Sequence, residues 1–197
     1  MTKLILASAS PRRRQMLSDL GIPFQIMVSE ADENCKETDP CRYAEEISQK
    51  KASAVLRLVC PDQIVIACDT VVAMQDQILG KPKDGEDAKR MLRMLSGKRH
   101  RVISALTVAN AQKSVTKSVV TDVTFREITA AEIEAYVASG EPMDKAGAYG
   151  IQGLGGLFVL GINGDWNTVV GMPLAELKLI LKNDFDVDFF ALRDGIE

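Results

Sequence analysis

The sequence predicts an α/β protein with a mixed sheet and flanking helices. In the first half of the chain, apolar segments of strand length alternate with segments of helical periodicity, as in α/β folds. In the middle, residues 102–109 and 115–126 form two long strand patterns joined by a polar turn at 110–113, and we expect them to pair antiparallel. Together the two observations favour a sheet that is part parallel and part antiparallel.

The first 68 residues should supply three strands and two helices. Strands are expected at 4–7, 24–28 and 64–68, the last of them leading into Asp69, and helices at 11–20 and 40–59. The longer helix is expected to turn Tyr43, Ile47, Ala54 and Leu58 inward.

The remainder of the chain opens with a hairpin-like return at 75–77. A helix starting at Asp84 should bury Ala88, Met91, Leu92 and Leu95, which recur at helical spacing. A capping-box pattern, Thr129 to Glu132, opens a helix to about Ser139. After a glycine-rich stretch at 147–164, Pro173 begins a last helix, and we expect the acidic tail from Asp184 to be loosely ordered.

Composition limits the classes of function. The chain has 197 residues, enough for one domain spanning 1–197, and its net charge of −3 argues against a nucleic-acid polymer as partner. No apolar run reaches the ~20 residues of a membrane span, so we expect no membrane partner. The N-terminus is a poor secretory signal because three arginines, 12–14, interrupt any apolar region.

The cysteines and the single histidine offer little metal chemistry. No pair of the four cysteines is spaced C-x-x-C, so a zinc site is not expected, and reduced thiols suit a cytoplasmic protein. His100 lies in the basic run at 98–101, which we interpret as the solvated start of a strand. A Ser-His-Asp triad is therefore not expected either.

The run at 8–14, Ser-Ala-Ser-Pro-Arg-Arg-Arg, is the strongest candidate for a binding site. Ser10 is a good N-cap, and Pro11 suits the first position of a helix. Helix N-termini attract anions, and arginines such as Arg12 and Arg13 match phosphate oxygens, so Ser8, Ser10 and these arginines predict a phosphate site. A well-capped helix with a basic, solvated first turn is the alternative.

Carboxylates supply the second set of candidates. Asp69 follows a buried strand, where α/β enzymes often place a general base or a metal ligand, although a turn aspartate that caps the backbone fits equally well. The acidic loop at 29–39 adds Glu30, Asp32 and Glu33, which could recruit Mg²⁺ or Mn²⁺ or simply be solvated.

Two lysines and one glycine-rich segment complete the candidates. Lys51, within the long helix, and Lys81, before Pro82, could neutralise phosphate charge, although Lys51 could also be an ordinary surface cation. The segment at 144–153 is rich in small residues that allow close approach to a ligand, and Gln152 offers a donor and an acceptor side by side. A tight loop packed on the core is the alternative.

With these segments in view, the chain resembles the Maf family of nucleotide pyrophosphatases. The matching segments are 8–13, Glu33, Lys51, 67–72, 80–82, 122–125 and 145–153, and they keep the family's order through most of the chain. The resemblance implies an elongated two-lobed fold similar to inosine triphosphate pyrophosphatases, with a cleft between the lobes, and suggests a homodimer.

The resemblance also implies an activity: hydrolysis of a nucleoside triphosphate to a monophosphate and pyrophosphate, aided by a divalent cation. Asp69 falls on the family's catalytic position, and with Glu33 it would organise Mg²⁺ or Mn²⁺. The turn at 8–13, Lys51 and Lys81 would hold the triphosphate. Arg12, Thr70 and Gln152 look like the subgroup that prefers dTTP and UTP, which implies clearance of excess or modified pyrimidine nucleotides.

Two alternatives stay open. One is an enzyme of the same family that acts on 7-methyl-GTP, for which Gln152 would not matter. The other is a nucleotide-binding regulator of cell division and septum formation that binds pyrimidine triphosphates without turnover. The pair of Glu33 and Asp69 favours an enzyme, because binding without turnover requires no base.

Overall fold

A mixed sheet forms the spine of the protein. The computed structural model describes residues 4–75 and 77–194, within which the sheet has seven strands in the order β2-β1-β3-β5-β6-β7, with β4 paired to β3. The strands are β1 (Leu4–Leu6), β2 (Phe24–Ile26), β3 (Ile64–Met74), β4 (Gln77–Leu79), β5 (Arg99–Ala109), β6 (Ser114–Phe125) and β7 (Val159–Asn163). β1 is parallel to β2 and β3, and the other neighbours are antiparallel, which confirms the predicted mixed sheet.

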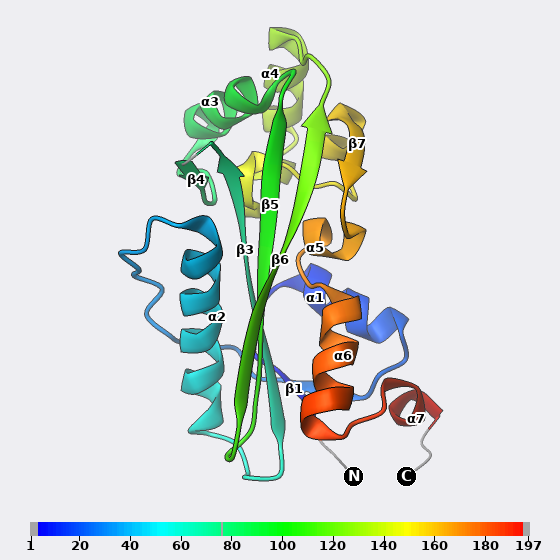
Figure 1. Ribbon diagram of the computed structural model, residues 1–197. Coiled ribbons are helices and arrows are strands. Elements are labelled where there is room, and N and C mark those ends of the chain that lie inside the picture. The colour runs from blue at the N-terminus through cyan, green and yellow to red at the C-terminus, as the bar shows by residue number, and fades with distance from the viewer. Residues whose placement is uncertain (1–3, 76, 195–197) are drawn as a thin grey trace.

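The helices cover both faces of this sheet and its far end. They are α1 (Pro11–Asp19), α2 (Pro40–Leu56), α3 (Gly85–Leu95), α4 (Ala130–Ala138), α5 (Trp166–Val170), α6 (Leu174–Phe185) and α7 (Phe189–Asp194), with short 3₁₀ turns η1 (Glu141–Asp144), η2 (Ala146–Ala148) and η3 (Leu154–Phe158). Figure 1 shows an elongated molecule in which α2 lies on one side of the long strands and α1 and α6 on the other. The strands β3, β5 and β6 run from the lobe that holds β1, α1 and α6 into the lobe that holds β4, α3 and α4.

The two faces of β1 and β3 alternate strictly. Leu4, Leu6, Ile66 and Cys68 join the main core with α1 and α6, whereas Ile5, Ala7, Val65 and Ala67 pack with α2. Successive side chains of a strand point to opposite faces, so the next two residues of β3 divide in the same way. Asp69 goes with the α2 side and Thr70 with the α1 side.

The long helix is shorter than predicted and turns a different face inward. α2 ends at Leu56, so Leu58 lies beyond it and is 70% exposed, and its predicted inward position is wrong. Ile47 is buried as predicted, while Tyr43 and Ala54 are only half-buried. The buried face also carries the small residues Ala44, Ser48 and Ala52, which large apolar residues at helical spacing do not reveal.

His100 is buried, so its predicted solvated position is wrong. Its side chain is only 3% exposed and packs edge-to-face against Phe125 at 4.8 Å and Tyr149 at 5.5 Å between ring centroids. Its Nε2 lies 2.9 Å from the Tyr149 hydroxyl. The basic run does start β5, but strand alternation sends His100 to the core face while its neighbours Arg99 and Arg101 face outward or partly outward.

Several other expectations are confirmed. β5 and β6 form the antiparallel pair, α3 starts after Asp84 and buries the four expected residues, and α4 has the capping box between Thr129 and Glu132. β3 and β4 form the expected hairpin, although residue 76 at its turn lies outside the described residues. The glycine-rich stretch contains η3 and β7, neither of which its composition predicts.

The expectation of a loose acidic tail is wrong for residues 186–194. α6 continues to Phe185, α7 follows it, and the tail buries Val187 and Phe189 against the main core. Residues 195–197, the end of that tail, lie outside the described residues.

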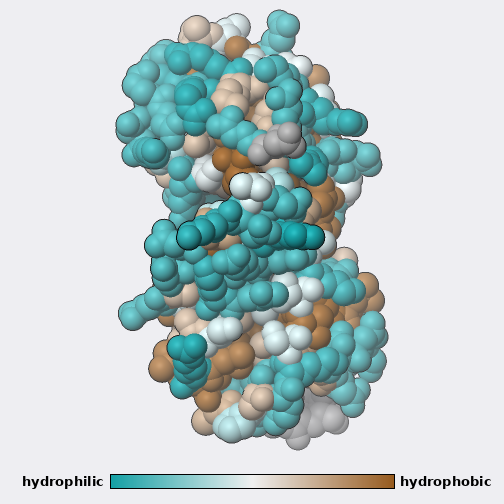
Figure 2. Space-filling model, turned by 60° about the vertical axis from the view of Figure 1, so that its left-hand side comes forward, coloured by the Kyte–Doolittle hydropathy of each residue, from teal (hydrophilic) through white to brown (hydrophobic). Residues whose placement is uncertain are grey.

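The surface on the α2 side is mostly hydrophilic, and hydrophobic residues show only in separate patches (Figure 2). Among the described residues, no helix is both long and apolar enough to cross a bilayer.

Candidate active site

A cleft of about 1280 Å³ opens beside the middle of β3. The start of β3, Ile64–Ile66, pairs with β1, and its end, Val72–Met74, pairs with β4. Between them, residues 67–71 pair with β5 on one edge only. The cleft lies along this uncovered edge, so Asp69 and Thr70 line it from inside a continuous strand. The prediction that the strand ends before Asp69 is therefore wrong.

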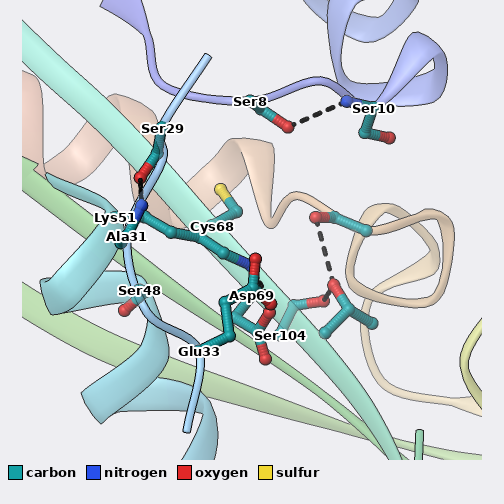
Figure 3. A network of polar contacts seen from close by, with 12 residues as sticks. Ser8, Ser10, Ser29, Ala31, Glu33, Ser48, Lys51, Cys68, Asp69 and Ser104 are labelled. Atoms are coloured by element: carbon teal, nitrogen blue, oxygen red, sulfur yellow. Dashed lines mark hydrogen bonds and ion pairs between the residues drawn. The ribbon is translucent and has the colours of Figure 1, made fainter. Parts of the chain in front are cut away.

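Asp69 is paired with Lys51 across the α2 side of the sheet. The Lys51 ammonium lies 2.8 Å from Asp69 Oδ1 and 3.2 Å from Glu33 Oε2, and the Lys51 and Asp69 side chains are each 13% exposed. In Figure 3 the Lys51 side chain extends from α2 towards Asp69, and Glu33 approaches from the acidic loop. A carboxylate can accept several hydrogen bonds, so the Lys51 bond at Oδ1 leaves Asp69 Oδ2 able to accept a further hydrogen bond.

Arg13 ties the other side of the cleft together. Its Nε donates to the Gly171 carbonyl at 2.8 Å, and its terminal nitrogens donate to the Cys68 carbonyl at 2.8 Å, the Thr70 hydroxyl at 3.0 Å and Ser8 Oγ at 3.4 Å. Four of its five N–H groups are therefore engaged by the protein. One of them satisfies the Cys68 carbonyl, in the part of β3 that pairs with β5 alone among the described strands.

Arg12, Ser8 and Ser10 line the same wall of the cleft. The Ser8 side chain accepts from the Ser10 amide at 3.2 Å, and Ser10 caps α1 by accepting from the Arg13 amide at 3.5 Å. Arg12 forms an ion pair at 3.1 Å with Asp144, which comes from η1 in the other lobe. The Arg12 side chain is 30% exposed and lines the cleft.

The opposite wall carries Lys81 and Gln152, both exposed to the cleft. Lys81 follows β4, and the Gly80 carbonyl accepts from the Gly147 amide at 3.0 Å, which joins this turn to the glycine-rich segment. Gly147 has φ of +67°, and a Cβ there would lie 2.7 Å from a methyl carbon of Val72. Glycine is thus required where this segment crosses β3.

All ten residues singled out for the site line this one cleft. They are Ser8, Ser10, Arg12, Arg13, Glu33, Lys51, Asp69, Thr70, Lys81 and Gln152. Glu30 and Asp32, the other candidates of the acidic loop, do not line it.

Sequence reasoning missed two contributors. Ser104 Oγ lies 2.8 Å from the Thr70 hydroxyl and donates to the Thr168 carbonyl at 2.8 Å. The two residues face each other across β3 and β5, so only the register of that pairing could have revealed this contact. Glu141 lines the cleft, whereas Ser104 supports it from behind Thr70, and the sequence gives no signal for Glu141 beyond its place between a helix and a glycine-rich segment.

The cysteine beside Asp69 is not a nucleophile at neutral pH. Cys68 is buried, and burial raises the pKa of its thiol to about 11. The thiolate, which is the reactive form, is therefore scarce.

The donor set suits a divalent cation completed by substrate. Glu33 and Asp69 converge on one ammonium, and no third His, Cys, Asp or Glu joins them in a cluster among residues 4–75 and 77–194. Mg²⁺ is commonly held by one or two carboxylates together with water and substrate phosphates. The two carboxylates fit that pattern and do not form a closed protein cage.

The fold and the cleft define an α/β protein that is built to attract an anionic ligand, with cations on both walls and a carboxylate pair between them. The profile of the family described as Maf-like protein matches residues 3–184, and the chain belongs to this family. The resemblance seen in the motifs is thus confirmed.

Named relatives cover nearly the whole chain. A dTTP/UTP pyrophosphatase of Shigella boydii serotype 4 (strain Sb227) is 46% identical over 195 residues, covering 98% of this chain and 96% of that protein. Proteins with the same name are 45% identical in Escherichia coli O157:H7, with the same coverage, and in Yersinia pestis bv. Antiqua, where 93% of each chain is covered.

Likeness to solved structures is weaker. The Ham1 protein of Staphylococcus aureus has a TM-score of 0.47 at 12% identity and covers 63% of this chain and 72% of its own. A HAM1 protein from Coxiella burnetii has a TM-score of 0.43 at 11% identity, covering 64% and 73%.

Proposed function

We propose that this protein hydrolyses dTTP and UTP to the nucleoside monophosphate and pyrophosphate. The observation that carries the proposal is the Lys51–Asp69 pair in the cleft of a chain that is 46% identical, over nearly its full length, to proteins named dTTP/UTP pyrophosphatase. Excess or modified pyrimidine triphosphates are the substrates this activity would remove.

The cations of the cleft would hold the triphosphate. Arg12, Lys51 and Lys81 reach the cleft from α1, α2 and the turn after β4. The serines at 8 and 10 add hydroxyl groups beside the N-terminus of α1, where the helix dipole favours negative charge. Arg13 contributes mainly by holding this wall in place, because most of its donors are engaged by the protein.

Asp69 would accept a proton from the attacking water. Attack at the α-phosphorus forms a new P–O bond and breaks the bond to the β-phosphate oxygen, so pyrophosphate leaves. Lys51 would stabilise negative charge beside this carboxylate and on the phosphates. Glu33 and Asp69 would hold a divalent cation, Mg²⁺ or Mn²⁺, which would offset the charge that develops on the departing pyrophosphate.

Gln152 would read the base from the opposite wall. Uracil and thymine present an N3–H donor beside a carbonyl acceptor, and a glutamine amide can pair with both. A site that pairs both groups rejects analogues by leaving polar groups unpaired. Arg12 and Thr70 line the same cleft and would complete the preference for this base class.

The test is pyrophosphate release from UTP, dTTP, CTP, GTP, 7-methyl-GTP and ATP, with Mg²⁺ or Mn²⁺ present, together with calorimetric binding of UTP. We expect release from UTP and dTTP far above the other nucleotides. Release from 7-methyl-GTP in their place would contradict the substrate and the role of Gln152. Binding of UTP with no release from any nucleotide would contradict the enzyme and favour a regulator of cell division.

A further inference from the structure

The segment that carries Gln152 is anchored by a carboxylate outside the catalytic set. Glu141 Oε2 accepts the Leu154 amide at 2.9 Å, and Glu141 Oε1 accepts the Gly155 amide at 3.1 Å. These two amides lie two and three residues after Gln152. Glu141 thus fixes the C-terminal side of the segment.

A tyrosine from α4 anchors the other side. The Tyr136 hydroxyl accepts the Gly150 amide at 3.1 Å, two residues before Gln152, and donates to Glu141 Oε1 at 2.9 Å. The two anchors are therefore joined, and one hydrogen-bonded unit holds the chain on both sides of Gln152. The Tyr136 side chain is buried, so its position is set by the core of this lobe.

Close packing shows that this segment is seated directly on the carboxylate. A Cβ on Gly153 would lie 2.5 Å from Glu141 Oε2 and 2.6 Å from Oε1. The backbone next to Gln152 can approach Glu141 only because it carries no side chain there.

The hydrogen bonds of Glu141 also argue against a role as general base. Burial acts to raise the pKa of its carboxyl, but the Leu154 and Gly155 amides and the Tyr136 hydroxyl outweigh burial and lower it. Both of its oxygens are already used as acceptors by the protein.

We infer that Glu141, with Tyr136, is a positioning residue for base recognition: it holds Gln152 at the distance from which its amide can read uracil or thymine. This inference rests on the proposed function, because it depends on Gln152 as the base reader. Glu141 acts through Gln152 and has no direct part in the chemistry at Asp69.

Two variants test it, Glu141→Gln and Tyr136→Phe. An amide at position 141 keeps one acceptor oxygen and turns an NH₂ group towards a backbone N–H, so at least one anchor is lost. Phenylalanine at 136 keeps the ring and removes the hydroxyl that joins both anchors. Glu134→Gln is the matched control, because Glu134 is an exposed carboxylate on α4, the helix of Tyr136, and is paired with Lys89 away from the cleft.

The measurements are the dissociation constant of UTP by calorimetry, KM and kcat for UTP, and inhibition by inorganic pyrophosphate, which has no base. We expect both variants to weaken UTP binding and raise KM about five- to ten-fold, the effect of losing roughly one hydrogen bond to the base. We expect kcat and inhibition by pyrophosphate to change less than about two-fold. A variant that is merely less folded would lower kcat and leave KM unchanged.

A Gln152→Ala background separates this inference from the proposed function. With the Gln152 amide removed, Glu141→Gln and Tyr136→Phe should add less than about two-fold to the loss of UTP binding. Unchanged UTP binding in both single variants, or a full additional loss in the Gln152→Ala background, would overturn the inference. If wild-type protein binds UTP without releasing pyrophosphate, the proposed function fails, and the calorimetric comparison still decides the role of Glu141. If UTP does not bind at all, both fail.

Discussion

The Arg13 guanidinium lies 3.0 Å from the Thr70 hydroxyl, and this contact joins the first turn of α1 to the strand that carries Asp69. Ser10 caps α1 as predicted, while the phosphate site at this turn stays a proposal. Arg13 serves the architecture with most of its donors, whereas Arg12 reaches the mouth of the cleft and the opposite lobe.

Arg13→Lys should destabilise the fold. A lysine cannot reproduce the fork that satisfies the Cys68 and Gly171 carbonyls, so we expect the free energy of unfolding in urea to fall by about 2 to 3 kcal/mol. Arg12→Lys should lower it by less than about 1 kcal/mol, because its ion pair is partly exposed. Exposed Arg14→Lys is the control. Equal effects at positions 12 and 13 would refute the division of roles.

Lys51→Met should damage activity more than stability. It keeps the length of the stem and removes the charge shared by Asp69 and Glu33, so we expect kcat/KM for UTP to fall about 100-fold or more. Lys182→Met, which changes an exposed lysine on α6 outside the cleft, should leave kcat/KM unchanged. A Lys51→Met protein with near wild-type kcat/KM would show that this ammonium does not assist the reaction.

His100 should make the fold sensitive to acid. Burial lowers the pKa of its imidazole from 6.5 to about 4 in the folded state. Above pH 6.5 the His100 imidazole is neutral in both the folded and the unfolded state. As the pH falls towards 4, the imidazole binds a proton in the unfolded chain but not in the folded protein, so the free energy of unfolding decreases. The free energy of unfolding lost through His100 should total about 3 kcal/mol, at about 1.4 kcal/mol for each pKa unit.

His100→Gln provides the check, because an amide can still bond the Tyr149 hydroxyl but does not titrate in this range. The free energy of unfolding, measured in urea between pH 7 and pH 4, should fall less steeply in this variant than in the wild type, whatever its value at pH 7. Equal slopes in the two proteins would rule out His100 as the source.

The sequence predicts the elements better than their ends. The hydrophobic periodicity of α3 and the alternation of β5 and β6 are local signals, and the structure confirms them. Asp69 shows the limit: it is polar inside a strand because its edge of the sheet is uncovered between β1 and β4, which depends on pairing between distant segments. The prediction for His100 is wrong for a similar reason, because the charged residues beside it do not reveal which face of the strand it occupies.

The sequence identifies the residues of the candidate site but not their arrangement in space. The ten candidates, which lie between positions 8 and 152, line one cleft, and their spacing along the chain gives no distances. The Lys51–Asp69 contact follows from strand alternation and the placement of α2, while the anchors of the Gln152 segment depend on tertiary packing around Tyr136. The contacts of Glu141 could therefore be recognised only in the structure.

The central claim is that Asp69 drives hydrolysis of UTP and dTTP in this cleft. The most direct measurement is pyrophosphate release from both nucleotides by the wild type, by Asp69→Asn, and by the control Asp62→Asn, which changes an exposed aspartate in the turn before β3. Asp69→Asn should lower kcat by about 10² to 10⁴-fold while the protein stays folded and still binds UTP, and the control should match the wild type. Wild-type rates in a folded Asp69→Asn protein would contradict the account.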